Sequence, residues 1–212
     1  MLWEDFINAL LHRTPPHLIE HIHLVFLAMF FAILVSFPAA VIITREKYLP
    51  YTDRVLSIFN VGQTVPPLAV ISIFLPFLGV GTGPAVFALT IYALLPIARN
   101  TVAGLASVPT ETKEAALGMG MQPKEVFLQV ELPLCLPVIL AGVKTSAVLT
   151  IGTATLAALV GAGGLGAVIF AGINFFRAEL ILAGTVALGA MALAMDRLIT
   201  LVEVLVLPPH LR

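Results

Sequence analysis

The stretch KEAALGMGMQPKEVFLQVELP, Lys113 to Pro133, is polar and rich in helix-forming residues, whereas the segments on either side are almost entirely apolar. Residues 111–119 predict one short helix, which two glycines interrupt. Proline suits the first turn of a helix, so a second short helix is expected to begin near Pro123. A loop that only reverses the chain needs few residues, and this longer segment, residues 107–133, therefore indicates a docking surface.

The composition around this segment is that of an integral membrane protein. The chain has 212 residues, of which 59% are hydrophobic and 11% charged, and its mean hydropathy is +1.05. A bilayer core needs about 20 apolar helical residues to cross it, so the chain has room for five or six spans and no soluble catalytic domain. A net charge of −1 excludes a basic nucleic-acid surface. The single cysteine, Cys135, excludes an internal disulfide and a cysteine-based metal site.

Five apolar runs are long enough to span, and charges, prolines or glycines bound each of them: about 22–43, 55–78, 84–106, 134–160 and 180–206. The glycine-rich segment 159–179 is too short to span again and predicts a turn and a re-entrant or interfacial piece at the outer face. Residues 2–11 lack the pattern of a signal peptide and predict a short amphipathic helix on the outer membrane surface, with a frayed tail as the alternative.

The distribution of lysine and arginine predicts the orientation, because cytoplasmic loops carry an excess of these residues. Seven fall on one side: Arg45, Lys47, Arg54, Arg99, Lys113, Lys124 and Arg212. Two, Arg13 and Arg177, fall on the other, and Lys144 and Arg197 lie within spans. The amino terminus is therefore expected outside and the carboxyl terminus in the cytoplasm, which places residues 107–133 on the cytoplasmic side.

The polar segment also contains a spaced motif: Glu114-Ala115-Ala116, three residues, Gly120, nine residues, Val130, one residue, Leu132-Pro133. It resembles the EAA motif of binding-protein-dependent ABC importer permeases, with Val130 in place of isoleucine. In that family the two short helices are coupling helices that seat in a groove of the ATPase. The alternative from the residues alone is an amphipathic pair that caps the bundle.

The resemblance implies one permease domain over residues 1–212 with the type I, MetI-like fold in the plasma or inner membrane. It implies three partners: a second permease subunit, identical or paralogous, a pair of cytoplasmic ABC ATPases, and an extracytoplasmic solute-binding protein. The ATPase would bind the ATP, and this chain would need no cofactor, metal or catalytic residue. Consistent with this, no GxxxxGK[ST] phosphate loop occurs in the sequence.

Several segments are similar to permeases of the glycine betaine, carnitine and choline branch: Leu89–Leu105, Glu114–Met121, Val130–Val148 and Ile151–Gly166. This resemblance implies an osmoprotectant importer. Ala167 and Ala171 depart from the branch, which has Asp and Arg at these positions. Two alternatives stay open: an ABC importer for another small solute such as methionine, and a channel or secondary transporter that works without an ATPase.

The glycines Gly161, Gly163, Gly164 and Gly166 satisfy the GxGxxG pattern of dinucleotide sites. That fingerprint needs a preceding strand and a following crossover helix, neither of which fits the end of a membrane span. These glycines instead predict a tight turn and close helix packing, or a hinge of an outer gate.

Polar residues within the spans are expected to avoid lipid. Asn60, Gln63, Thr64, Tyr92, Thr150 and Thr153 are candidates either for helix-to-helix hydrogen bonds or for the lining of the translocation path. Lys144 is expected to extend toward the cytoplasm or to pair with a carboxylate, and Asp196 is a candidate partner. His21 and His23 predict a polar flank of the first span at the membrane surface.

Overall fold

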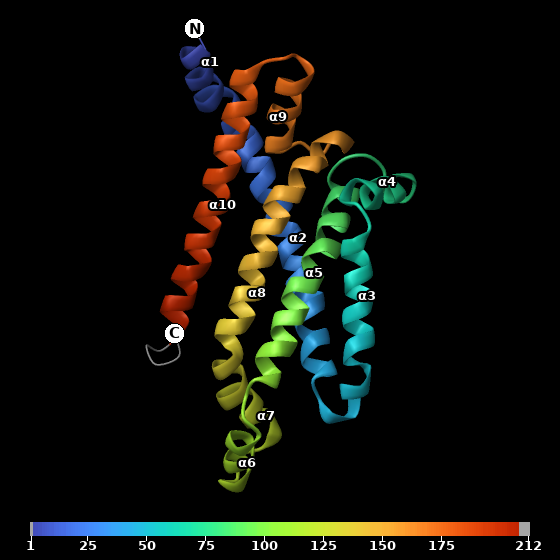
Figure 1. Ribbon diagram of the computed structural model, residues 1–212, viewed down its shortest axis with the longest axis vertical. Helices are drawn as coiled ribbons and strands as arrows, with labels where there is room; N and C mark the ends of the chain where they lie inside the picture. The colour runs from blue at the N-terminus through green and yellow to red at the C-terminus, as the bar shows by residue number, and fades with distance from the viewer. Residues whose placement is uncertain (1, 208–212) are drawn as a thin grey trace.

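The computed structural model describes residues 2–207, in which every regular element is a helix (Figure 1). Arg212, which the orientation count includes, lies outside the described residues. The α-helices are α1 (Leu2–Asn8), α2 (Thr14–Ile43), α3 (Thr52–Thr64), α4 (Pro67–Leu78), α5 (Thr82–Ala106), α6 (Thr110–Gly118), α7 (Pro123–Val126), α8 (Leu132–Thr153), α9 (Leu165–Asn174) and α10 (Ala178–Val206). They are joined in places by π-helical turns, Ala9–Arg13 and Phe127–Glu131, and by 3₁₀-helices, Glu46–Tyr51 and Ala154–Val160.

The long helices form an elongated bundle with two distinct ends (Figure 1). One end carries α6 and α7, and the opposite end, called here the α9 end, carries α4 and α9. Four continuous helices in the described part are long and apolar enough to cross a membrane: Trp3–Ile43, Thr82–Ala106, Pro123–Val160 and Ala178–Val206. A fifth span is present if the bent pair α3–α4 counts as one. The prediction of an all-helical membrane protein with about five spans is confirmed.

The expected second span, residues 55–78, is wrong as a single membrane-crossing helix. The axis bends by 92° between α3 and α4, so α3 runs along the bundle and α4 turns across the α9 end (Figure 1). Pro66 and Pro67 cause the break, because proline lacks the N–H that continues a helix and disfavours helical geometry in the residue before it. Val65 accordingly has the extended angles φ −75° and ψ 132°.

The amino-terminal segment is helical, but the prediction of a separate surface helix over residues 2–11 is wrong. α1 continues through the π-helical turn into α2, and the described helix from Trp3 to Ile43 has 41 residues. Its apolar residues Phe6 and Ala9 pack against Leu180 and Ala183 of α10. The apolar face of this segment is therefore buried against α10. An isolated amphipathic helix would bury the same face in the membrane surface.

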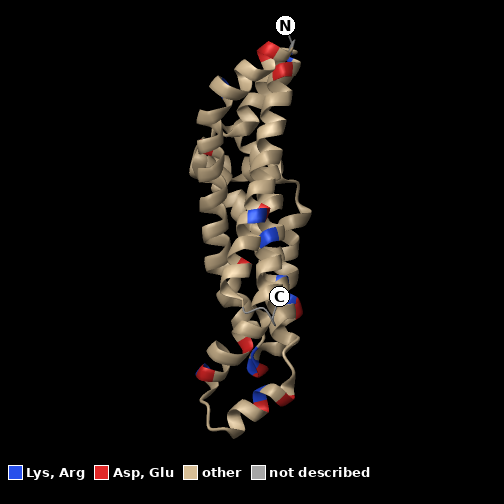
Figure 2. Cartoon of the chain, turned by 90° about the vertical axis from the view of Figure 1, so that its left-hand side faces the viewer, with Lys and Arg blue, Asp and Glu red and all other residues tan. Residues whose placement is uncertain are grey.

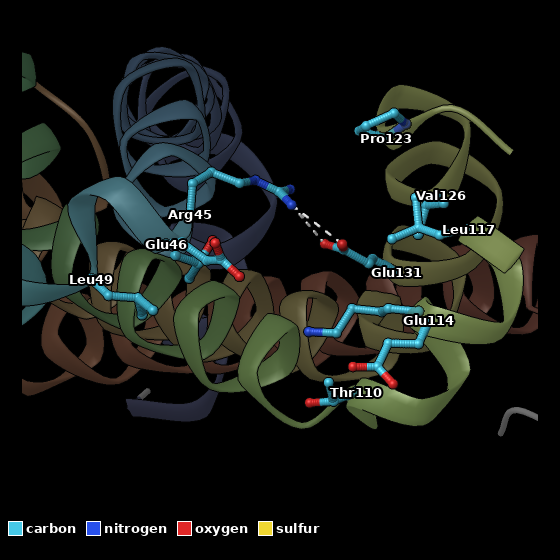
Figure 3. A pocket seen from close by; sticks show the side chains of 11 residues that line it. Arg45, Glu46, Leu49, Thr110, Glu114, Leu117, Pro123, Val126 and Glu131 are labelled. Carbon is cyan, nitrogen blue, oxygen red and sulfur yellow. Dashed lines mark hydrogen bonds and ion pairs between the residues drawn. The ribbon is translucent and has the colours of Figure 1, made fainter.

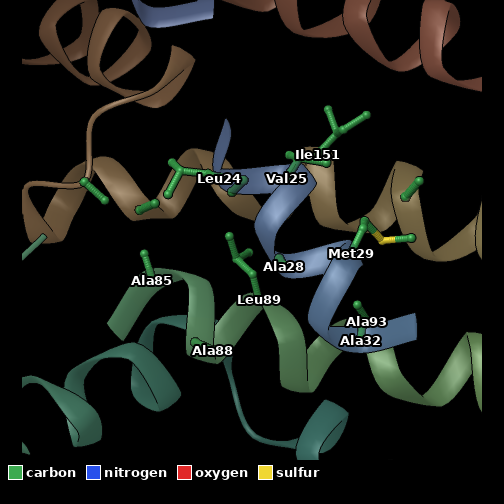
Figure 4. Close-up of a cluster of buried hydrophobic side chains, with 14 of the residues drawn as sticks. Leu24, Val25, Ala28, Met29, Ala32, Ala85, Ala88, Leu89, Ala93 and Ile151 are labelled. Carbon is green, nitrogen blue, oxygen red and sulfur yellow. The ribbon is translucent and has the colours of Figure 1, made fainter. Parts of the chain in front are cut away.

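The core lies where α5 packs between α2 and α8 (Figure 4). Many of its buried residues are alanines, among them Ala28, Ala88 and Ala93, and larger side chains such as Leu89 fill the remaining space. Small residues let membrane helices approach closely, so that packing and dispersion replace the hydrophobic drive that lipid cannot supply. At Gly142 of α8 an added Cβ would lie 2.5 Å from Cβ of Asn100 and 2.8 Å from the Pro96 carbonyl oxygen of α5.

The glycine segment forms a turn between the 3₁₀-helix that follows α8 and the start of α9. Gly161, Gly163 and Gly164 have φ of 76°, 76° and 80°, values that residues with a Cβ adopt only with strain. Gly166 has a different role, because a Cβ there would overlap the carbonyl oxygen of Thr155. The turn therefore needs glycine for backbone conformation at three positions and for close packing at the fourth.

His21 does not belong to a polar flank at the membrane surface, and the prediction for it is wrong. Its side chain is fully buried on α2, where Nε2 donates to the Ile151 carbonyl at 3.0 Å and Nδ1 accepts from the Leu165 N–H at 3.2 Å. The preceding Glu20 accepts from the Gly164 N–H at 2.8 Å. Two consecutive side chains of α2 thus hold both sides of the glycine turn, whereas His23 is exposed as expected.

Replacing His21 with alanine should destabilise the fold far more than the same change at His23. The variant leaves a buried N–H and a buried carbonyl without a partner, and each unpaired group costs about 1–3 kcal/mol. Thermal unfolding of the two variants in one detergent would measure the difference. Equal midpoints for His21→Ala and His23→Ala would contradict the role given to His21.

Candidate functional site

The candidate site lies at the α6–α7 end and is built from three pieces of chain. These are α6, the α7 helix with the π-helical turn that follows it, and the 3₁₀-helix Glu46–Tyr51 that follows α2. Together they enclose a cleft of about 670 Å³ (Figure 3). The spaced motif runs through all of this region: Glu114-Ala115-Ala116 lies on α6, Gly120 in the turn after it, Val130 in the π-helical turn, and Leu132-Pro133 at the start of α8.

The turn after α6 explains why glycine stands at position 120. The Gly120 N–H donates to the Leu117 carbonyl at 2.9 Å, and the Met121 N–H donates to the Ala116 carbonyl at 3.2 Å. This pair of bonds is the Schellman arrangement, which satisfies the last carbonyls of a helix and requires a left-handed residue. Gly120 supplies it with φ of 92°.

The second helix starts with two independent signals. Pro123 occupies the first helical turn, and the Glu125 carboxylate accepts from the Gln122 N–H at 2.7 Å, which is half of a capping box. The expectation that this helix is a separate short element is wrong. It continues through the π-helical turn into α8, so the described helix runs unbroken from Pro123 to Val160 over 38 residues.

The π-helical turn explains how the helix accommodates proline at its entry to α8. The Leu132 N–H bonds to the carbonyl of Phe127, five residues back instead of four. This turn comes immediately before Pro133, whose missing N–H and bulky ring would otherwise interrupt the regular ladder. The second short helix and the span expected from residue 134 are therefore parts of one continuous helix.

The three residues of EAA take different positions on α6. Ala116 is 2% exposed and packs inward, whereas Glu114 and Ala115 are exposed. The neighbouring Leu117 and Met119 are 48% and 78% exposed, so the outer face of α6 combines a carboxylate with apolar surface. Further along, Val130, Leu132 and Pro133 are half-buried and belong to the join with α8.

An ion pair that sequence reasoning missed crosses the cleft. Nη1 of Arg45, just after α2, lies 3.0 and 3.3 Å from the two carboxylate oxygens of Glu131 (Figure 3). The guanidinium also lies over the Phe127 ring, 4.7 Å from its centroid. Glu131 is 8% exposed, and a buried carboxylate needs such a partner. Its one sequence signal is a charge among apolar neighbours, and nothing there points to a partner 86 residues away.

The polar residues proposed for the path do not gather in one place. Gln63 donates to the Tyr92 carbonyl at 2.6 Å and ties α3 to α5. Thr150 is buried inside the bundle, 3.8 Å from Sδ of Met29 on α2, so both of these residues make helix-to-helix contacts. Thr153 is half-buried and its hydroxyl bonds to its own helix, at the Leu149 carbonyl.

Two of the proposed path residues stay on the surface of the described chain. Asn60 and Thr64 are exposed on one side of α3, and the Thr64 hydroxyl bonds to the carbonyl of Val61 in the same helix. The Tyr92 hydroxyl is buried and has no hydrogen-bond partner among residues 2–207. Of the six candidates, only Asn60 and Thr64 are exposed in the described part of the chain, and both lie on α3.

The fold is that of an ABC importer permease. The inward-facing MetNI methionine ABC transporter aligns with 95% of this chain and 98% of its own with a TM-score of 0.80 at 23% identity. The family model "Binding-protein-dependent transport system inner membrane component" matches residues 50–206. The chain belongs to this family and is a transport subunit, as the motif had indicated.

Three curated proteins are similar over most of their length. The choline transport system permease protein OpuBB of Bacillus subtilis is 41% identical over 92% of this chain and 88% of its own. The osmoprotectant import permease protein OsmY of Salmonella typhimurium is 43% identical over 85% and 76%. The glycine betaine/carnitine/choline permease protein OpuCB of Bacillus subtilis is 39% identical over 97% and 92%.

Gly120→Ala should loosen the turn between α6 and α7, and Gly118→Ala is the matched control. A Cβ meets no atom within 4 Å at either position, so only backbone conformation separates them. The positive φ at Gly120 costs a residue with a Cβ about 1–3 kcal/mol, while alanine inside α6 is expected to be neutral or stabilising. Hydrogen exchange at the Met121 amide should accelerate in Gly120→Ala alone. Unchanged exchange there would contradict the Schellman assignment.

Proposed function

We propose that this chain is a permease subunit of an ATP-driven importer for osmoprotectants, the quaternary ammonium solutes choline, glycine betaine and carnitine. The observation that carries the proposal is identity of 39–43% to permeases with these names over most of the chain. The methionine alternative rests on a fold likeness at 23% identity, which says nothing about the solute. Family membership sets aside the alternative of a transporter that works without an ATPase.

The chain would deliver solute together with three partners. A solute-binding protein would present the solute at the α9 end, and a second permease subunit would complete the translocation path. The exposed polar groups of Asn60 and Thr64 suit a face that borders water or another subunit instead of lipid. A pair of cytoplasmic ATPases would bind ATP and dock at the α6–α7 end. The amino terminus would then lie outside and the carboxyl terminus in the cytoplasm.

The α6–α7 end has the physical properties that coupling requires. Glu114, Ala115 and Leu117 offer a charge, a close approach and an apolar contact on one short helix. Movement imposed on α7 would pass directly into α8, because the two belong to one continuous helix. The Arg45–Glu131 pair would carry the same movement to α2. Two membrane helices would thus shift as one rigid body when the ATPases close.

Uptake measurements test the solute and the coupling together. The chain is reconstituted in liposomes with its ATPase and binding protein, and ATP-dependent uptake of choline, glycine betaine and carnitine is measured. Glu114→Arg should lower uptake about tenfold or more and weaken co-purification of the ATPase, because reversing a contact charge disfavours association. Glu111→Arg on the same helix is the control and should change little. Failure of all three solutes with the unaltered chain would overturn the proposed function.

The orientation has a separate test with engineered cysteines in a Cys135→Ala background. Gly118→Cys, at an exposed position of α6, should react with a membrane-impermeant maleimide only in inside-out vesicles. Arg13→Cys, exposed near the other end, should react only in right-side-out vesicles. The opposite pattern would invert the assigned topology.

A further inference from the structure

A partly exposed ion pair joins α8 to α10, far from both ends of the bundle. Nζ of Lys144 on α8 is 2.9 Å from Oδ1 of Asp196 on α10 and donates to the Thr200 hydroxyl at 3.1 Å. Lys144 is 21 residues after Pro123 and 16 before Val160 in one continuous helix, roughly 30 and 25 Å from its two ends. Figure 2 shows most charges near the ends of the molecule and a small group at mid-height. The predicted pairing of Lys144 with Asp196 is confirmed.

The pair is incompletely satisfied and borders open space. The side chains of Lys144 and Asp196 are 33% and 37% exposed, and with Thr145, Val148 and Leu149 they line a hollow of about 320 Å³. Among residues 2–207, one N–H of the ammonium and the second carboxylate oxygen of Asp196 have no partner. A donor with positive charge and an acceptor with negative charge therefore stand side by side at the hollow.

Placing two charged groups at this depth in the membrane costs free energy unless they face water or a bound solute. Charged groups at the depth of the hydrocarbon face a protein interior or a water-filled cavity, not lipid. A partly exposed ion pair usually contributes little to stability, so stability alone gives little reason for it. The hollow is at the small end of the 300–1,000 Å³ or so that ligand pockets occupy, and it suits a small solute.

We propose that this hollow is a transit site for the solute, in which Asp196 balances the quaternary ammonium group and Lys144 binds the carboxylate of a zwitterionic solute. The inference rests on the proposed function and adds the residues that recognise the solute inside the membrane. A cation such as choline would use Asp196 alone, whereas glycine betaine would use both charges. The residues that line the hollow include no aromatic side chain, so recognition depends on charge and not on an aromatic cage. The site is therefore weak and distinguishes charge types, not methyl groups.

A purely structural role makes a different prediction. If the pair only fastens α10 to α8, removing one charge impairs every solute equally. If the pair is a transit site, Lys144→Met impairs glycine betaine uptake and spares choline, because the carboxylate that attracts the cation is still present. Asp196→Asn impairs both solutes. The ratio of the two uptake rates therefore separates the roles.

The experiment uses the complete transporter in liposomes, with uptake of choline and of glycine betaine measured relative to the unaltered chain. In Lys144→Met the ratio of glycine betaine to choline uptake should fall about tenfold, the effect of losing one charge-assisted hydrogen bond. Lys144→Arg should restore the ratio. Arg197→Gln removes an exposed charge next to Asp196 but outside the hollow, and it should leave the ratio unchanged.

A second variant covers the possibility that a single charge left unpaired prevents assembly. The double variant Lys144→Met, Asp196→Leu replaces the pair with apolar side chains, an exchange that proteins commonly tolerate. It should keep ATPase activity in the assembled complex and lose uptake of both solutes. Wild-type uptake in this variant would overturn the transit site while the proposed function stands, and so would parallel losses of both solutes in a Lys144→Met complex that assembles and hydrolyses ATP. If the unaltered chain transports neither solute, the proposed function fails and the site fails with it.

Discussion

The whole structure depends on one constraint, which is that a backbone in hydrocarbon must satisfy its own hydrogen bonds. Regular helices satisfy these bonds internally, whereas irregular stretches need other partners, and in the described part of this chain side chains supply several of them. The glycine turn before α9 is the clearest case. There Glu20 and His21 of α2 accept hydrogen bonds from the N–H groups of Gly164 and Leu165. The Ile151 carbonyl accepts a hydrogen bond from His21, and the Tyr92 carbonyl accepts one from Gln63. Polar side chains thus bind backbone groups of the glycine turn and of neighbouring helices.

A second consequence concerns how α2 and α8 are joined. Near the α9 end the His21 ring connects α2 to Ile151, and at the α6–α7 end Arg45 connects α2 to Glu131. Between these points both helices pack against α5 through alanine and glycine, which leaves little space for sliding. The two helices are therefore connected by side-chain bonds near both ends. α10 is linked to α8 by the Lys144–Asp196 pair in the middle, and its residues Ala187 and Met191 belong to the buried core.

Sequence patterns were reliable where the information is local. The four continuous spans follow from apolar runs, and the turn at Gly120 follows from glycine at a helix end. Errors arose where the geometry depends on distant partners. Pro66 and Pro67 explain the break after α3, but the direction of α4 depends on its packing against α5 and the 3₁₀-helix Ala154–Val160. The short helix near Pro123 and the span from residue 134 were expected as separate elements, because hydropathy separates polar from apolar segments and does not detect a helix that continues across both.

The sequence by itself determined the class of protein, the four continuous spans and the place of the segment from Glu114 to Pro133 along the chain, because these depend on composition, hydropathy and spacing. Only the tertiary structure decided that His21 is buried and that Arg45 meets Glu131. It also decided that Thr150 lies in the core, whereas Asn60 lies on the surface. The physical reason is that a polar side chain in an apolar span must find a partner, and residues 86 or 130 positions apart become partners only when the helices have packed.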